Sequence, residues 1–274
     1  MRRSGRSAIR DRPGFAGLRG GNRDTMARIL LTGASGSIGT MLRERLPGLR
    51  PTDLHPSDGV EQLDVTDADA VRAACRGAAA VVHLGGIASE GPFEDVLAVN
   101  VRGTERVLQA AHENGVPRVV LASSNHAAGL HPHADGLPDD VPARPDSYYG
   151  WSKAAMESLG RLYHDRYGLH VVCLRIGSCK DRPEHPRDLA SWLSPGDAAR
   201  LVRAALTATG FHIVWGVSAN TRRWWSTAGG DAIGYAPEDD AEAWAGEVGE
   251  PDPADPVNRL VGGPMATKPL GRPD

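Results

Sequence analysis

Tyr149 and Lys153 lie four positions apart in the string YGWSK, a spacing that puts both side chains on one face of a helix. A lysine ammonium beside a phenol favours the phenolate, which lowers the phenol pKa from about 10 and makes it a usable base near neutral pH. Ser124 ends the apolar string RVVLASS. There it would hydrogen-bond the substrate oxygen from which Tyr149 takes a proton. Taken alone, a Tyr and a Lys at this spacing more often form a solvated surface pair. Their order after Ser124 and a glycine-rich loop favours a catalytic role for all three residues.

That glycine-rich loop, GASGSIG, follows the apolar string RILLT near the start of the chain. Gly33 permits a tight turn, Gly36 lets backbone N–H groups approach a pyrophosphate, and Gly39 allows a helix to pack on a strand. Ser37 and Ile38 would lie at the helix N-terminus, whose partial positive charge favours phosphate. Because the loop lies between an expected strand and an expected helix, it predicts a dinucleotide-binding site.

Asp53 lies 20 residues beyond Gly33, at the expected end of the second strand. A carboxylate there accepts hydrogen bonds from the adenosine ribose diol and repels a 2′-phosphate, so its position favours NAD over NADP. A loop-capping aspartate in TDLHP is the structural alternative. The other expected cofactor contacts are Asp64, which would reach the adenine amine, with the adjacent Val65, and Leu84, Gly85 and Gly86, which end a strand where the cofactor would cross.

Short apolar strings alternate with amphipathic stretches from Met26 onward. Strands are expected at 27–33, 79–86, 118–124, 169–177 and 211–216. Between the first two of these, another strand is expected to end near residue 53, although Pro51 is unfavourable inside it. Helices are expected at 37–46, from 66, and at 94–114, 147–167 and 195–208. This alternation predicts an α/β fold, a doubly wound Rossmann-type parallel sheet with a small C-terminal substrate-capping region.

Three segments are expected along the chain. Residues 1–25 are rich in Arg and Gly and lack apolar periodicity, so they are interpreted as a disordered or spurious leader. The twin arginines Arg2 and Arg3 suggest an export signal, but no apolar stretch follows them. Residues 26–245 are expected to form an NAD-binding Rossmann domain that carries the active site, and residues 246–274 an irregular tail.

Bulk composition limits the classes of function. The 274 residues carry a net charge of -3, with 41% hydrophobic and 24% charged residues, so no basic field favours nucleic acid. No apolar run of 18 residues is present, and Cys75, Cys173 and Cys179 fit neither a zinc site nor a disulfide framework. We therefore expect a cytoplasmic protein without metal, nucleic-acid or membrane partners. A homo-oligomer is also expected, with the helix near 94–111 or the tail as its interface.

Several strings resemble the extended short-chain dehydrogenase/reductase superfamily, namely TGASGSIG, then Asn100 in a long helix, then ASS and YxxxK. Less common strings resemble uronate dehydrogenase within that superfamily. They are HLGGI at 83–87, ASSNHAAG at 122–129, RIGSC at 175–179 and HIVWGVSAN beside Trp224 and Trp225. The resemblance covers nearly everything from Arg28 to the C-terminal tail, and the last two strings are the most specific.

The resemblance implies oxidation of a hexuronic acid such as glucuronate or galacturonate at its anomeric carbon, with NAD as the cofactor and an aldarolactone as the product. Tyr149 would take the anomeric hydroxyl proton, Lys153 would tune it and Ser124 would hold the oxygen. It further implies a cofactor contact at Asn100 and a set of sugar contacts: Asn125 and His126 at the hydroxyls, Ser178 and Arg187 at the carboxylate. An arginine suits this role because its planar fork matches a carboxylate, although a solvated loop arginine is the ordinary alternative.

One departure from the family pattern concerns the residue after HLGGI, which is commonly a serine that contacts the substrate carboxylate. Ala88 stands there in this chain and cannot donate a hydrogen bond, while Ser89 follows it and is included among the expected substrate contacts.

Two other functions share these motifs. A nucleotide-sugar epimerase or dehydratase has the same fold and YxxxK chemistry, but only 95 residues follow Cys179, which is scant for a nucleotide-binding lobe. A non-catalytic NAD-binding sensor would be expected to lose the Tyr or the Lys, and this chain keeps both.

Overall fold

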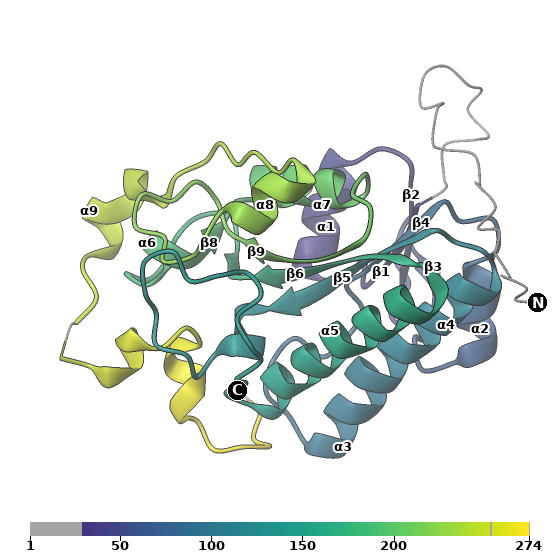
Figure 1. Cartoon of the computed structure of the whole chain (residues 1–274), viewed down its shortest axis with the longest axis horizontal. Helices are drawn as coiled ribbons and strands as arrows, with labels where there is room; N and C mark the ends of the chain where they lie inside the picture. Colours follow the sequence, from purple (N-terminus) through teal and green to yellow (C-terminus); the bar gives the residue numbers. More distant parts are fainter. Residues whose placement is uncertain (1–28, 253, 274) are drawn as a thin grey trace, which may run out of the picture.

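A seven-stranded parallel sheet forms the centre of the protein in the computed structural model, which describes residues 29–252 and 254–273 (Figure 1). The predicted leader at 1–25 lies outside the described residues. The strand order is β3-β2-β1-β4-β5-β6-β9, and every neighbouring pair is parallel. The strands are β1 (Ile29–Thr32), β2 (Leu49–Asp53), β3 (Glu61–Gln62), β4 (Ala80–His83), β5 (Arg118–Ser124), β6 (His170–Ile176) and β9 (Phe211–Gly216).

Helices cover both faces of this sheet, as Figure 1 shows. One face carries α1 (Ser37–Arg45), α7 (Pro195–Ala205) and α8 (Ala228–Ile233), and the other carries α2 (Ala68–Ala74), α4 (Gly103–Glu113) and α5 (Tyr148–Tyr167). β2 and β3 lie on one side of β1, and β4, β5, β6 and β9 lie on the other. The crossover point, where the strand order reverses, therefore lies between β1 and β4. Doubly wound sheets bind their ligands at that point, outside the carboxyl ends of the strands. The predicted Rossmann-type fold is confirmed.

Shorter elements complete the described chain beyond these layers. They are α3 (Phe93–Val96), the π-helical η2 (Leu97–Arg102), η3 (Asn125–Ala128), β7 (Ser178–Cys179) paired with β8 (Trp192–Leu193), α6 (Asp188–Ser191), η4 (Ala241–Trp244), α9 (Ala245–Val248), η5 (Pro256–Arg259) and η6 (Gly263–Thr267). No helix in the described ranges combines the length and apolar character needed to cross a bilayer.

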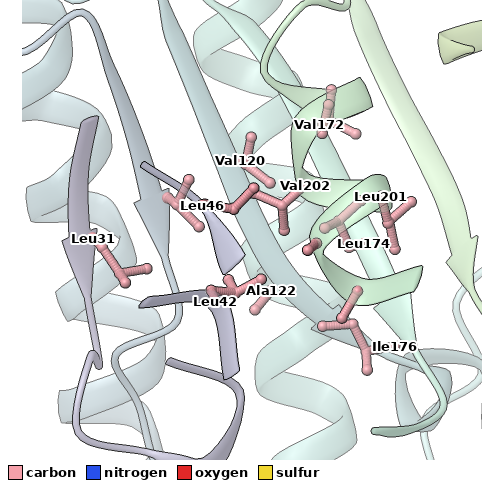
Figure 2. Close-up of a cluster of buried hydrophobic side chains, with 14 of the residues drawn as sticks. Leu31, Leu42, Leu46, Val120, Ala122, Val172, Leu174, Ile176, Leu201 and Val202 are labelled. Carbon is pink, nitrogen blue, oxygen red and sulfur yellow. The ribbon is translucent and has the colours of Figure 1, made fainter. Parts of the chain in front are cut away.

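Alternating side chains of the strands build a separate core on each face of the sheet. On β1, Leu31 faces α1 and α7, whereas its neighbour Leu30 belongs to the core under α2, α4 and α5. Figure 2 shows the first core, in which Leu42 of α1 and Leu201 of α7 point toward the strand residues. Strands that are apolar on both sides explain why the sequence shows continuous apolar strings there.

The expected helix at 147–167 is confirmed as α5 to within one residue. Ser147 caps its N-terminus by accepting a hydrogen bond from the Gly150 N–H at 2.9 Å, and Gly168 ends it in the left-handed conformation. Pro51 is tolerated because β3 pairs only with Thr52 and Asp53, so β2 is an edge strand at the proline.

The long helix expected at 94–114 is interrupted. Its middle, Leu97–Arg102, is π-helical, which an apolar periodicity of 3.6 residues does not reveal. The buried side chain of Asn100 lies in this interruption.

A buried ion pair joins α5 to the sheet. The Arg175 side chain on β6 is 1% exposed and its Nη2 lies 2.8 Å from Oε2 of Glu157 on α5. Ser123 at the end of β5 donates a hydrogen bond to Glu157 at 2.6 Å, and Arg175 also donates to two backbone carbonyls. Because Glu157 lies one turn beyond Lys153, this network sets the position of the helix face that carries the expected catalytic residues.

Replacing Glu157 by Gln tests that network. Glu157→Gln is expected to lower the free energy of unfolding by about 3–5 kcal/mol, because it leaves the Arg175 guanidinium buried without its counter-ion. Asp165→Asn is the matched control on the same helix, since Asp165 pairs with Arg161 at 2.8 Å but both side chains are at least half exposed. Exposed pairs contribute little. Similar urea midpoints for the two variants would contradict the role assigned to Glu157.

Candidate active site

A cavity of about 750 Å³ opens at the carboxyl ends of β1, β4 and β5. Its lining contains nearly all the residues that the sequence singles out for the cofactor and for catalysis. They are Gly33, Gly36, Ser37, Ile38, Gly39, Asp53, Asp64, Val65, Leu84, Gly85, Gly86, Ser124, Tyr149 and Lys153. The volume and the mixture of glycine backbone and polar side chains fit an extended dinucleotide.

The glycine-rich loop has little room for side chains. Gly33 adopts φ +71°, and a Cβ on it would lie 2.6 Å from the Gly85 nitrogen and 2.7 Å from the Leu84 carbonyl carbon. A Cβ on Gly39 would overlap the backbone of Gly33 and Ala34. No side chain caps the N-terminus of α1, so the N–H groups of its first turn remain for a ligand at the cavity wall. The loop therefore fits a dinucleotide pyrophosphate.

Asp53 ends β2, as the spacing predicts, and serves the loop as well as the cavity. Its carboxylate accepts hydrogen bonds from the N–H groups of Ser35 at 2.9 Å and His55 at 3.0 Å. The loop-capping alternative is thus realised, and the carboxylate still lines the cavity, where a ribose diol could donate to it. Asp64 likewise accepts from Thr66 and lines the cavity.

Asn100 is placed differently from the other expected cofactor contacts. It is fully buried and is absent from the cavity lining. Its amide oxygen accepts from the Ile87 N–H at 2.7 Å, and its amide nitrogen donates to the Ile87 carbonyl and to Ser152. Asn100 therefore braces the loop after β4 from behind, and its expected contact with the cofactor stays a prediction.

Tyr149, Lys153 and Ser124 come together as the spacing predicts. Tyr149 and Lys153 lie on one face of α5 with Nζ 5.4 Å from the phenol ring centroid. Lys153 Nζ donates to the Ala122 carbonyl at 2.8 Å, and the Ser124 hydroxyl at the end of β5 is hydrogen-bonded to the Tyr149 phenol. All three residues are buried at the inner end of the cavity.

The expected direction of the Tyr149 pKa is wrong for the protein alone. Burial raises the pKa of Tyr149 to about 12, and the Asp146 carboxylate adds to this, while the hydrogen bond from Ser124 opposes it. Burial also lowers the pKa of Lys153 to about 8, so the lysine charge is itself costly here. Sequence spacing reveals that the two groups are close but not how completely water is removed from both.

The expected substrate contacts lie beside the cavity. His126 is edge-on to the Tyr149 ring, with centroids 5.8 Å apart, and its Nδ1 lies 2.7 Å from Asp146 Oδ2. Asn125 and Arg187 both donate to the carbonyl of Val261. Asn125 and Arg187 thus share one acceptor and His126 adjoins the cavity through Tyr149, although none of the three is among the lining residues.

Ser178 and Ser89 are less directly placed. Ser178 is hydrogen-bonded to Asp188, and its hydroxyl accepts from Ser191, so it contacts α6, whose first residue follows Arg187. Ser89 is half-buried, whereas Ala88 is exposed and lines the cavity. The position at which the family commonly has serine is therefore the one that faces the site.

Three contributors were missed at the sequence level. Asp146 holds His126, Val261 accepts from Asn125 and Arg187, and Glu90 accepts from the N–H groups of Tyr149 at 3.0 Å and Gly271 at 2.7 Å. Asp146 directly precedes the cap of α5, which is a weak signal in hindsight. The other two act through contacts between distant segments, and no local pattern predicts such contacts.

Comparisons with known proteins agree with this geometry. Residues 29–180 match the model of the NAD dependent epimerase/dehydratase family. A uronate dehydrogenase of Agrobacterium fabrum is 41% identical over 261 residues, which cover 89% of this chain and 98% of that protein. The crystal structure of a uronate dehydrogenase from Agrobacterium tumefaciens, a mutant complexed with NAD, aligns with a TM-score of 0.84 at 41% identity, covering 89% of this chain and 98% of that chain.

The chain belongs to the uronate dehydrogenase family. Its cofactor is accordingly NAD, and it is an NAD-dependent oxidoreductase. The predictions of family, fold and cofactor are confirmed. Sugars other than uronates also occur in the names of similar proteins, since an NAD-dependent glucose-6-phosphate dehydrogenase of Haloferax volcanii is 37% identical over 256 residues, covering 81% of this chain and 97% of that protein.

Alanine at Gly33 tests the glycine loop of this uronate dehydrogenase family member. Gly33→Ala is expected to weaken NAD binding and to lower the free energy of unfolding by about 1–3 kcal/mol more than Gly77→Ala, because its Cβ overlaps a second backbone. Gly77 is a matched control, since it also has φ +71° but nothing lies within 4 Å of an added Cβ. Urea unfolding and NAD titration of both variants measure the difference, and equal losses would contradict the close contact.

Lys153 is expected to destabilise the NAD-free protein below pH 8. Its folded pKa of about 8 lies below the unfolded value of 10.5, so the charge cost, on the order of 3 kcal/mol, is complete below pH 8. The cost disappears as the pH rises from about 8 to 10.5, above which the lysine is neutral in both the folded and the unfolded protein. Lys153→Met is therefore expected to gain Tm relative to wild type most at pH 7, and the gain should shrink toward pH 10.

Lys180→Met provides the control for this pH dependence. Although burial opposes it, contacts with Glu184 and Asp188 raise the pKa of Lys180 above 10.5. The Tm difference caused by Lys180→Met should therefore not change between pH 8 and 10. A Lys153→Met difference that is equally flat over this range would show that Lys153 titrates normally.

Proposed function

We propose that this enzyme oxidises cyclic hexuronic acids, glucuronate or galacturonate, at C1 to the aldarolactone with NAD. The observation that carries the proposal is the state of Arg187. Its Nη1 is buried without a hydrogen-bond partner, while Nη2 donates to the Val261 carbonyl. A buried guanidinium N–H without an acceptor is costly, and a substrate carboxylate would supply that acceptor.

The surroundings of Arg187 strengthen this argument. Burial lowers its pKa to about 10, against the opposing effect of Asp188 and Asp146. One face of the guanidinium lies over the Trp224 ring, 4.7 Å from its centroid, and Trp224 in turn stacks on His133. A cation held on an aromatic face is oriented but not neutralised. The site therefore favours an anionic substrate over a neutral sugar.

Tyr149, Ser124 and Lys153 supply the proton chemistry of the proposal. The C1 hydroxyl would lose its proton to Tyr149 Oη while Ser124 holds the same oxygen. When bound, NAD supplies the acceptor of the C1 hydride and a positive ring charge that favours the otherwise costly buried phenolate. Lys153 would stabilise that phenolate from the same helix face, and His126, held by Asp146, would contact a sugar hydroxyl.

The remaining expectations stay predictions. They are a nucleotide-sugar epimerase or dehydratase and a non-catalytic NAD sensor as alternative functions, a homo-oligomer, a cytoplasmic location, and the division into a Rossmann domain at 26–245 and a tail at 246–274. Support for the small acidic substrate over a nucleotide sugar comes from Arg187, because its Nη1 is unpaired, its Nη2 shares the Val261 carbonyl with Asn125, and the carboxylate of Asp146, the partner of His126, acts on its pKa.

The substrate assignment is tested by NADH formation at saturating NAD with glucuronate, galacturonate, glucose and glucose 6-phosphate compared side by side. We expect turnover of the uronates and little of glucose, and we expect Tyr149→Phe to abolish it while NAD still binds. Turnover of glucose 6-phosphate alone would show that the substrate is a sugar phosphate and not a uronate. An NAD-binding protein that oxidises none of the four would favour the sensor or the nucleotide-sugar alternatives.

Arg187→Lys tests how the carboxylate is bound. Lysine keeps the charge but loses the planar fork, so KM for glucuronate is expected to rise about 10- to 100-fold, the loss of one charge-assisted hydrogen bond. Arg182→Lys is the matched control in the same loop, because the Arg182 side chain is 68% exposed and meets Glu247 only at 4.0 Å. Equal KM values for the two variants would rule out Arg187 as the carboxylate contact.

A further inference from the structure

The irregular C-terminal segment passes directly over the candidate substrate site. Val261 is fully buried, its N–H donates to the His131 carbonyl at 2.9 Å, and the Gly262 N–H donates to the Gly129 carbonyl at 2.8 Å. Leu260 forms an antiparallel bridge with Pro132. Backbone hydrogen bonds thus hold this part of the tail against the loop that follows β5 and η3.

One carbonyl of this segment serves two side chains of the site. The Val261 carbonyl accepts from Asn125 Nδ2 at 2.9 Å and from Arg187 Nη2. These two residues lie 136 and 74 positions away in the sequence. A carbonyl oxygen has two lone pairs, so this atom is fully used by the two donors.

The two glycines that follow leave no free space around the neighbouring charged groups. A Cβ on Gly262 would overlap the Asp146 carboxylate, which accepts a hydrogen bond from Ser147 Oγ and lies 2.7 Å from His126 Nδ1. Gly263 has φ +60°, and a Cβ there would lie 2.7 Å from Arg187 Nε and 2.8 Å from Cζ. The backbone of the tail therefore contacts the guanidinium directly.

We propose that Val261, Gly262 and Gly263 are positioning residues of the substrate site. The Val261 carbonyl fixes Nη2, Gly263 packs against Nε and Trp224 covers one face, which leaves Nη1 as the free donor for a substrate anion. The same carbonyl turns the Asn125 amide, so the tail sets two sugar contacts together. Such preorganisation lowers KM because binding need not order these side chains. The identity of the anion rests on the proposed function.

A purely structural anchor for the tail predicts a different result. It would change overall stability, and its loss would affect NAD and sugar binding alike. A positioning role predicts a rise in KM for anionic sugars, with little change in kcat or in the NAD dissociation constant, because the cofactor cavity does not include residues 261–263.

The test compares Gly263→Ala with Gly249→Ala in the full chain. Both glycines have positive φ, but nothing lies within 4 Å of a Cβ added to Gly249. We expect Gly263→Ala to raise KM for glucuronate about tenfold or more, with kcat and NAD affinity within about twofold of wild type. Gly249→Ala should leave all three within about twofold, so equal KM values for the two variants would overturn the proposal.

A second pair of variants covers the case in which Gly263→Ala does not fold. Val261→Ala and Val214→Ala each shorten a fully buried valine, the first in the tail and the second on β9. Only Val261→Ala is expected to raise KM for glucuronate, because only it loosens the carbonyl that holds Asn125 and Arg187. A similar rise in KM for both variants would show that the tail only stabilises the fold, and it would overturn the proposal.

The wild-type protein separates this inference from the proposed function. If it oxidises glucose 6-phosphate but no uronate, the proposed substrate is wrong, and the same KM ratios with glucose 6-phosphate test the tail. If it oxidises neither sugar, calorimetric dissociation constants for glucuronate replace KM. Absence of binding by the wild type would overturn both.

Discussion

The close approach of two backbone turns at the crossover point is the constraint on which the rest of the site depends. Gly33 after β1 and Gly85 after β4 approach so closely that no side chain fits between them. Side chains at the ends of β1 and β4 support this contact. Thr32 accepts a hydrogen bond from the Gly85 N–H and is hydrogen-bonded to the buried His83. Because burial lowers the pKa of His83 to about 3, the histidine is neutral and acts as a structural link. The cavity floor is therefore rigid on both sides of the point where a dinucleotide must cross.

The buried charged side chains fall into two groups, those with a counter-ion and those without one. Arg175 and Glu157 neutralise each other and accept or donate further hydrogen bonds, so their burial is compensated. Lys153 is also buried, and Arg187 is half-buried with its Nη1 out of contact with solvent, but Lys153 donates to a backbone carbonyl and Arg187 Nη1 has no acceptor in the protein alone. Uncompensated charges of this kind occur where a ligand completes the site. The contrast distinguishes the residues that hold α5 in place from those that await cofactor and substrate.

The tail illustrates how a segment without regular structure can take part in recognition. It contacts the site through backbone groups, at Val261, Gly262 and Gly271. Glu90 links Gly271 to the N–H of Tyr149 at the start of α5. The tail thus contacts the expected substrate residues at Val261 and is linked to the start of α5 at Gly271.

Local chemistry in the sequence was sufficient for six of the seven strands of the sheet, β3 being missed, and for the glycine loop, Asp53 at the end of β2, and the Tyr149–Lys153 pair on one helix face. Each of these follows from backbone sterics or from the periodicity of a single element. The π-helical interruption around Asn100, the high pKa of Tyr149 and the partners of His126, Asn125 and Arg187 were decided only by the tertiary structure. Periodicity predicts which residues share an element, whereas desolvation and hydrogen bonding between distant segments depend on how the elements pack.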